Sequence, residues 1–189
     1  MITLEKVCFA YEHEVALRYV DLQIEKGDSV VIQGPNGCGK STLIKLLNGI
    51  IYPSEGHYFY KNHEITEKTL KDRQFAKWFH QQMGYVFQNA DTQLFCGSVE
   101  EEIAFGPVQM GLSETEVRQR TEDCLQLFGI EKLRERPPYH LSGGEKRKVS
   151  LACILSLNPE VLILDEPLAG LDKKTQDMLL EFLQSFHKA

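Results

Sequence analysis

The first part of the chain contains short apolar segments whose lengths and patterns predict β-strands. Ile2–Phe9 alternates loosely between apolar and polar residues, and Val20–Ile24 is a second segment of this kind. Ser29–Gln33 is a short, mostly apolar run that leads directly into a glycine-rich segment, which predicts a third strand. Gly56–Tyr60 and Gly84–Phe87 are also strand-like. We therefore expect several strands before residue 90.

Helical periodicity separates these strands and then dominates the middle of the chain. Ser41–Asn48 has apolar residues at positions 43, 44, 46 and 47, and Leu70–Gln82 predicts a further helix. Three more helices are predicted between residues 89 and 158. They are Val99–Phe105 after the N-cap Ser98, a helix from the capping box Ser113-Glu114-Thr115-Glu116 to Phe128, and Ser142–Leu157.

The last part of the chain returns to a strand and a helix. Val161–Leu164 predicts a buried strand, and Thr175–His187 predicts a helix with one apolar face. Strands thus flank a mostly helical insert, which indicates a single α/β domain. We expect a core of residues 1–88 and 159–189, with a parallel sheet and an antiparallel β edge near the N-terminus. Residues 89–158 would form a helical subdomain.

Composition narrows the class of protein. Of the 189 residues, 42% are hydrophobic and 25% are charged, which is typical of a packed globular domain. The net charge of −6 disfavours a general nucleic-acid binder, because such proteins normally carry a basic surface. No run approaches the roughly 20 apolar residues that cross a bilayer, and the N-terminal segment does not resemble a signal peptide. We therefore expect a soluble, cytosolic protein. The five cysteines form no CxxC pair, and their odd number argues against a disulfide framework.

One segment carries a phosphate-binding motif. Gly34-Pro35-Asn36-Gly37-Cys38-Gly39-Lys40-Ser41 matches G-x-x-x-x-G-K-[ST] between a predicted strand and a predicted helix. The glycines let backbone N–H groups surround a polyphosphate, and the following helix presents its positive end. Lys40 would reach the β and γ phosphates, and the Ser41 hydroxyl would bind Mg²⁺. Thr42, the next residue, is also expected to bind the nucleotide. We predict that this segment binds Mg-ATP, and that ATP protects the thiol of Cys38 from alkylation.

A pair of acids follows the last predicted strand. Val161–Leu164 would deliver Asp165 to the carboxyl end of a parallel sheet, which is where ligands bind in α/β folds. Asp165 would hold Mg²⁺ directly or through water. Glu166 would orient or deprotonate the water that attacks the γ-phosphate. The two acids therefore predict ATP hydrolysis beside the phosphate loop.

Leu141-Ser142-Gly143-Gly144-Glu145 points to a family. With the two motifs above, it resembles the signature segment of the ABC ATPases, which opens a helix in their helical subdomain. Ser142 is a suitable N-cap for such a helix. The resemblance implies an ABC-type phosphate-loop fold. It also implies that the N–H groups of Ser142, Gly143 and Gly144 bind the γ-phosphate of ATP held by another subunit.

The resemblance extends to a class within that family and covers residues 1–189. Residues 84–95, 98–107 and 141–152 look like the ATPases of cobalt-type and energy-coupling-factor importers. Gln88 matches the Q-loop glutamine, which touches Mg²⁺ and the attacking water. Tyr11 matches the aromatic residue that stacks on adenine. Asp172, after Leu171, matches the D-loop that acts across the dimer.

The resemblance also implies partners and a location. A second ATPase subunit, identical or a paralogue, would face this one head to tail. A transmembrane coupling subunit would dock near Gln88–Phe95, which places the protein at the cytoplasmic face of the membrane. Two alternatives stay open: a nucleotide-binding regulatory subunit without turnover, and an ABC ATPase that is not part of a transporter.

Two further expectations concern charged residues. Lys146-Arg147-Lys148 is expected to form a solvated helix face. In ABC ATPases the helix after the D-loop leads to one more strand, which ends in a switch histidine. The sequence ends at Phe186-His187-Lys188-Ala189, and His187 lies at a helix end, so we expect the switch histidine to be missing and turnover to be slow.

Overall fold

The structure is a computed structural model that describes residues 1–12, 14–168 and 170–188, the last four by their backbone alone. Internal contacts divide it into two compact units, residues 1–78 with 181–189, and residues 79–180. The division into a core and a helical subdomain at 89–158 stays a prediction.

The first unit is built on an antiparallel sheet. It contains β1 (Ile2–Tyr11), β2 (Glu14–Ile24), α1 (Lys40–Leu47), β3 (Glu55–Tyr60), β4 (His63–Glu64), the 3-10 helix η1 (Thr69–Lys71) and most of α2 (Arg73–Gln82). The strand order is β2-β1-β3-β4, and Ile2 pairs with both Ile24 and Tyr60. This sheet confirms the antiparallel β edge predicted near the N-terminus.

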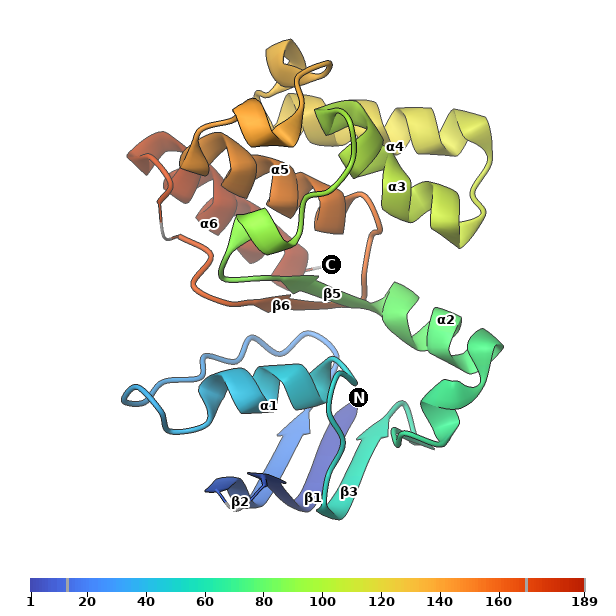
Figure 1. The fold of residues 1–189 in the computed structure, drawn as a ribbon, viewed down its shortest axis with the longest axis vertical. Helices are drawn as coiled ribbons and strands as arrows, with labels where there is room; N and C mark the ends of the chain where they lie inside the picture. Colours follow the sequence, from blue (N-terminus) through green and yellow to red (C-terminus); the bar gives the residue numbers. More distant parts are fainter. Residues whose placement is uncertain (13, 169, 189) are drawn as a thin grey trace. The chain divides into compact units, whose positions relative to one another are not determined.

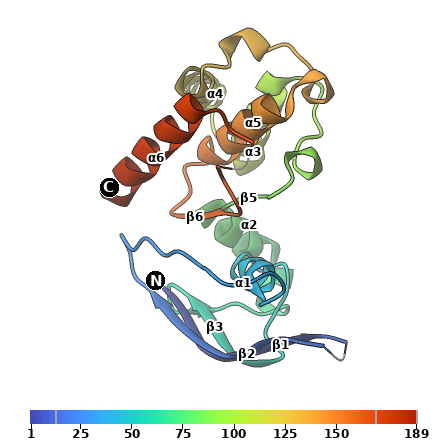
Figure 2. The same ribbon diagram turned by 90° about the vertical axis from the view of Figure 1, so that its left-hand side faces the viewer.

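Helix α1 covers one face of this sheet (Figures 1 and 2). The buried hydroxyl of Tyr58, on β3, donates a hydrogen bond of 2.8 Å to the carbonyl of Leu47 at the end of α1. Ile44 and Leu46 are buried on the same helix, and Ile2 is buried in the sheet. The helix that follows the glycine-rich segment is therefore anchored at its far end, which leaves its N-terminus for other contacts.

The strand predicted at Ser29–Gln33 does not form. Residues 29–33 belong to none of the hydrogen-bonded ladders found among the described residues. Val30, Val31 and Ile32 are 48%, 75% and 38% exposed. A β-branched run favours extended backbone, but a strand also needs a partner across its edge, and local pattern cannot supply one. The prediction for this segment was wrong for that reason.

The predicted helix at Leu70–Gln82 is divided at Asp72. Asp72 has extended backbone (φ −70°, ψ 117°) between η1 and α2. Its carboxylate accepts hydrogen bonds from the N–H groups of Gln74 at 3.0 Å and Phe75 at 2.8 Å. Asp72 therefore acts as a cap for α2, because its short side chain satisfies amides that have no partner within the helix.

The second unit combines a parallel strand pair with helices. It contains β5 (Met83–Val86), η2 (Ala90–Thr92), α3 (Val99–Met110), α4 (Glu114–Phe128), η3 (Glu131–Leu133), η4 (Pro138–His140), α5 (Gly143–Leu155), β6 (Val161–Leu164) and the first half of α6 (Lys173–Lys188). Val86 pairs with Leu164 in the parallel pair, and α5 runs beside β5 (Figure 1). The predicted α/β fold is confirmed.

Serine side chains begin the three helices between residues 99 and 155, as the sequence predicts. Ser98, Ser113 and Ser142 each accept a hydrogen bond from the N–H group three residues later. Helix α3 is longer than predicted, because it continues through Pro107 and ends at Gly111, which has φ 78°. These caps fix the residue at which each helix starts, and therefore which residues belong to the loop before it.

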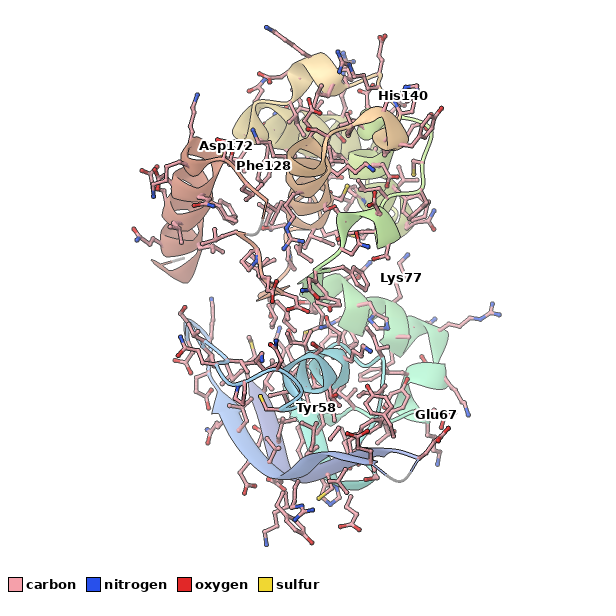
Figure 3. All side chains as sticks on the ribbon, turned by 60° about the vertical axis from the view of Figure 1, so that its left-hand side comes forward. Tyr58, Glu67, Lys77, Phe128, His140 and Asp172 are labelled. Carbon is pink, nitrogen blue, oxygen red and sulfur yellow. The ribbon has the colours of Figure 1, made fainter. Side chains whose placement is uncertain are left out.

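Side chains from α3, α4 and α5 form the core of the second unit. Phe128 (Figure 3), Leu125, Ile103 and Leu151 are buried there. Glu102 is a buried acid, 4% exposed, and it accepts hydrogen bonds from the N–H groups of Phe95 and Cys96. A buried carboxylate is therefore used to hold the loop before α3.

Helix α6 starts at Lys173, two residues earlier than predicted, and Leu179 is buried on its apolar face. The side chains of Phe186 and His187 lie outside the described residues, so the expectation about a switch histidine stays untested. None of the described helices combines the length and the apolar character needed to cross a membrane.

Candidate nucleotide-binding site

The phosphate-binding motif forms a glycine-rich loop that leads into α1. Gly37 and Gly39 have φ of 82° and 94°, a region that residues with a Cβ rarely adopt. A Cβ on Gly39 would lie 2.5 Å from the carbonyl oxygen of Ala16 on β2. A Cβ on Gly34 would lie 2.6 Å from the sulfur of Cys38. The loop therefore needs glycine where it bends back and where it passes close to β2.

The N-terminus of α1 has properties that suit an anion. Its N-cap is Gly39, no side chain caps it, and its first turn contains no acid. The first N–H groups of a helix have no partner within the helix, and its dipole favours negative charge there. The N-termini of α3, α4 and α5, by contrast, are closed by serine side chains.

Lys40 folds back over the loop that precedes it. Its ammonium group donates hydrogen bonds of 2.8 Å to the carbonyl oxygens of Gly34 and Pro35. A lysine ammonium, the first amides of a helix and the backbone N–H groups of a glycine-rich loop form the donor set that binds phosphates. The residues present at 34–42 therefore fit the polyphosphate of ATP.

Tyr11 belongs to the hairpin that contacts this loop. It lies at the end of β1, opposite Glu14 on β2, and Ala16 of β2 is the residue that approaches Gly39. The ring of Tyr11 is 43% exposed and lies 4.9 Å from the ring of Phe9, edge to face. An exposed, braced aromatic ring can stack on a base, and its role toward adenine stays a prediction.

The structure brings Gln88 and Glu166 into direct contact in the second unit. The side-chain amide of Gln88 donates a hydrogen bond of 3.0 Å to a carboxylate oxygen of Glu166. The two residues follow β5 and β6, and parallel neighbours end at the same edge of a sheet. Asp165 continues the pairing, because its N–H group donates to the carbonyl of Val86 at 3.3 Å.

Glu166 has an unusual backbone conformation. Its φ is 48°, in the left-handed region, where a residue that is neither glycine nor asparagine is uncommon. Such strain persists only where the surroundings stabilise it, and it is frequent at functional sites. Asp165 and Gln88 in this unit, and Ser41 in the first unit, each carry an oxygen donor of the kind that Mg²⁺ prefers, and their role toward Mg²⁺ stays a prediction.

The signature segment begins α5 with a capping box. Ser142 accepts from the N–H group of Glu145, and the Glu145 carboxylate accepts from the N–H group of Ser142 at 2.8 Å. The Ser142 hydroxyl is the main cause that lowers the pKa of Glu145. Gly143 faces open space, whereas a Cβ on Gly144 would lie 3.3 Å from the carbonyl of Gly170. The absence of side chains at Gly143 and Gly144 thus lets this capped helix start approach the segment before Asp172.

Asp172 caps the start of α6 (Figure 3). Its carboxylate accepts from the N–H group of Thr175 at 3.0 Å and from the Thr175 hydroxyl at 2.7 Å. These bonds, the hydroxyl first, lower the pKa of Asp172 to about 2, and Lys148 at 3.5 Å contributes less. Asp172 therefore has a structural partner, and its role across a dimer stays a prediction.

The basic run on α5 is not a solvated face. Lys146 forms an ion pair of 2.6 Å with Asp91, and Lys148 contacts Asp172. Arg147 is buried, with an exposed fraction of 3%, and donates to backbone carbonyls of the loops after β5 and β6. The expectation was wrong because charge alone does not show which way a helix faces. Spacing from the apolar run was an available signal, since Leu151, four residues later, is buried on the same face.

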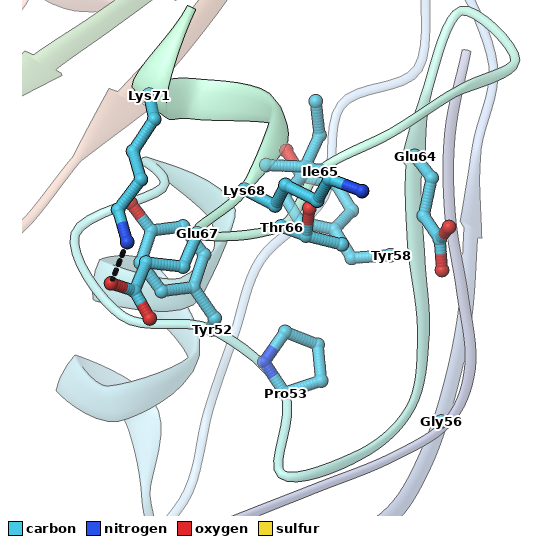
Figure 4. A pocket seen from close by; sticks show the side chains of 10 residues that line it. All are labelled: Tyr52, Pro53, Gly56, Tyr58, Glu64, Ile65, Thr66, Glu67, Lys68 and Lys71. Carbon is cyan, nitrogen blue, oxygen red and sulfur yellow. Dashed lines mark ion pairs between the residues drawn. The ribbon is translucent and has the colours of Figure 1, made fainter.

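A surface pocket of the first unit lies apart from all of these motifs (Figure 4). Its volume is about 340 Å³, and it is lined by residues of 52–58 and 64–71, none of them in the predicted site. Glu67 and Lys71 form an ion pair of 2.9 Å at its edge, and Glu64 and Lys68 also line it. With its acids and bases balanced, the pocket offers no net charge for an ionic ligand.

Comparison with known proteins places the chain in a family. The family model described as ABC transporter matches residues 17–169. The nickel import ATP-binding protein LarO of Lactiplantibacillus plantarum is 48% identical over 189 residues, which are all of this chain and 78% of that protein.

Two solved structures share the fold. CbiO1 from Clostridium perfringens, part of the ABC transporter complex cbiONQ, has a TM-score of 0.82 and 37% identity, covering 98% of this chain and 74% of that one. The ATP-binding cassette MJ0796, in a dimeric post-hydrolysis state bound to ADP and Pi, has a TM-score of 0.87 and 28% identity, covering 99% and 83%. These similarities extend over nearly the whole chain. The chain therefore belongs to the ABC transporter family of ATP-binding proteins.

Proposed function

We propose that this chain is the ATP-binding and ATP-hydrolysing subunit of an ABC importer of the cobalt/nickel or energy-coupling-factor type. The observation that carries the proposal is the hydrogen bond of 3.0 Å between Gln88 and Glu166. It joins a residue that can bind water to a residue that can accept a proton, at the end of a parallel strand pair.

ATP would be held by the first unit. The backbone N–H groups of 37–42 and the ammonium of Lys40 would bind the phosphates, because both are donors without a competing acid in the first turn of α1. Tyr11 would stack on the adenine. Ser41, Asp165 and Gln88 would hold Mg²⁺, which when bound would supply neutralisation of the phosphate charge.

Hydrolysis would depend on Glu166. Its carboxylate would accept a proton from the attacking water, while the Gln88 amide holds that water and the carboxylate in a fixed relation. Gly143 and Gly144 would present their N–H groups to the γ-phosphate bound by a second subunit, and Ser142 would add its own by exchanging the Glu145 carboxylate for the phosphate. The dimeric state of MJ0796 supports such an arrangement.

A membrane subunit would dock on the loop that follows Gln88. Phe95, in this loop, is 70% exposed, and its ring lies edge to face against that of Phe105 at 4.9 Å. Exposed aromatic pairs are typical of contact surfaces. The name of LarO supports nickel import, and that of the cbiONQ complex supports assembly into an ABC transporter, whose membrane partner would hold the protein at the cytoplasmic face.

The experiment has two steps. Calorimetry should detect binding of Mg-ATP to the chain and its loss in Lys40→Ala, because the phosphates then lack their cationic partner. ATP turnover and ⁶³Ni uptake are then measured in vesicles that contain the chain with the membrane subunits from its own operon. Binding without turnover would favour the regulatory alternative, and turnover without any membrane partner in the operon would favour a non-transport ABC ATPase.

A further inference from the structure

Arg147 is a buried arginine whose partners are all backbone groups. It lies on α5, five residues after the N-cap Ser142, and is 3% exposed. Its guanidinium donates hydrogen bonds to carbonyl oxygens of two separate loops. The Nη1 atom donates to Phe87 and, at 3.3 Å, to Gln88. The Nη2 atom donates at 2.8 Å to Asp165 and at 2.9 Å to Glu166.

The two arms of the guanidinium therefore connect the segments that carry the catalytic pair. One arm holds the loop after β5 and the other holds the loop after β6. A guanidinium is planar and rigid, so its two Nη atoms keep a constant separation and direction. Lysine, with a single nitrogen on a flexible chain, cannot contact both loops with the same geometry.

Burial makes Arg147 costly for the fold. A buried cation loses its hydration, and hydrogen bonds to carbonyl groups offset this free-energy cost less fully than a carboxylate would. Burial lowers the pKa of Arg147, and the nearby charges of Asp165 and Glu166 act in the opposite direction. Its Nε atom has no hydrogen-bond partner among the described residues. A methionine would fill similar space without this cost, so stability alone does not account for the arginine.

A second contact fixes the same loop from the other side. The N–H group of Phe87 donates to the side-chain oxygen of Gln93 at 3.3 Å, and the amide nitrogen of Gln93 donates to the carbonyl of Ser150 on α5 at 3.0 Å. The Phe87 residue is thus held at its N–H by Gln93 and at its carbonyl by Arg147. Both ties lead to the helix that the signature segment begins.

We propose that Arg147 is a positioning residue that aligns Gln88 and Glu166 for hydrolysis and ties their alignment to the signature helix. The inference rests on the proposed function. The guanidinium donates to the carbonyl of Glu166, a residue with left-handed backbone (φ 48°) whose carboxylate accepts a hydrogen bond from Gln88. Because both loops are hydrogen-bonded to α5, the positions of Gln88 and Glu166 are fixed relative to the signature segment that begins this helix.

The test compares Arg147→Met with Arg120→Met. Arg120 is a half-buried arginine of the same unit, and it serves as a control because its guanidinium donates only to backbone carbonyls away from the proposed site, those of Ser156 at 3.1 Å and Leu157 at 3.2 Å. Calorimetry gives the number of ATP-competent sites, and turnover is expressed per competent site. Amide hydrogen exchange is measured at residues 87–89 and 165–168.

We expect Arg147→Met to bind ATP normally and to lose about 10- to 100-fold in turnover per bound ATP, the order that a small misplacement of catalytic groups costs. Exchange should rise at both loops. Arg120→Met should change neither. Equal effects of the two substitutions on turnover and exchange would overturn the proposal, because Arg147 would then be an ordinary structural residue.

Arg147→Lys covers the case in which Arg147→Met fails to fold. It keeps the charge but not the fork, and we expect intermediate turnover with increased exchange at one or both loops. Turnover and exchange equal to the unsubstituted chain would overturn the proposal. If the unsubstituted chain itself binds ATP without turnover, the proposed hydrolytic function fails, and the exchange at residues 87–89 and 165–168 alone decides whether Arg147 positions the two loops.

Discussion

Gly37 and Gly39 of the glycine-rich loop share a positive φ but differ in how much space surrounds them. Both have positive φ, of 82° and 94°. A Cβ on Gly37 would meet nothing within 4 Å, whereas a Cβ on Gly39 would lie 2.5 Å from the carbonyl oxygen of Ala16 and 3.2 Å from Leu17. Alanine at the two positions therefore separates backbone strain from close approach.

The expected magnitudes follow from these contacts. Left-handed backbone costs a residue with a Cβ about 1–2 kcal/mol, so Gly37→Ala should lower the free energy of unfolding by that amount. Gly39→Ala adds a collision with backbone that cannot rotate away, at about 1–3 kcal/mol more. In Gly34→Ala the new Cβ would meet only the sulfur of Cys38, at 2.6 Å, and a thiol can change rotamer. We expect this third substitution to cost under about 1 kcal/mol.

Urea unfolding can measure these differences in the unit that contains the loop. Trp78 is the single tryptophan of the chain, and its ring lies 5.6 Å from Tyr60 and 5.4 Å from Phe75, so its fluorescence reports on this unit. The order of destabilisation should be Gly39→Ala, then Gly37→Ala, then Gly34→Ala. Equal losses at positions 37 and 39 would refute the reasoning, because the approach of Ala16 would then carry no energy.

Three more outcomes are expected. Glu166→Gln should bind Mg-ATP with little change in affinity but lose at least about 100-fold in turnover, since an amide cannot accept the proton of water; turnover equal to the parent in a coupled assay would exclude Glu166 as the base. Mass spectrometry should find that the exposed Cys38 is alkylated in the free protein and that Mg-ATP protects it. Cys124 should stay unlabelled in both cases, because burial raises the pKa of its thiol to about 12. Identical labelling of Cys38 with and without ATP would contradict its place in the site. Thr175→Val should raise the pKa of Asp172 from about 2 toward its ordinary value of 3.8. Because the folded-state pKa is the lower one, Asp172 favours the folded state above pH 3.8 and loses this contribution as the pH falls toward 2, so the substitution should weaken the pH dependence in that window. A carboxyl NMR titration that finds the same pKa in both proteins would show that Thr175 is not the cause.

Local chemistry was readable from the sequence because its partners are close along the chain. The capping box that begins α5 joins Ser142 to Glu145, three residues apart, so the residue types alone predict it. The glycines, Lys40 and the uncapped start of α1 follow from a contiguous motif in the same way. These features also carried the resemblance to the ABC ATPases.

Tertiary structure decided the contacts between distant segments. Gln88 and Glu166 are 78 residues apart, and only the parallel pairing of β5 with β6 brings them to one edge. The exposed backbone at 29–33 shows the same dependence, because a strand needs a neighbour that its own residues do not encode. Arg147 belongs to an apparently solvated basic run, yet its carbonyl partners lie 18 to 60 residues away, so its burial depends on which face of α5 meets the two loops. Sequence determines such residues only through the packing of the whole unit, since the energy of a buried charge depends on what surrounds it.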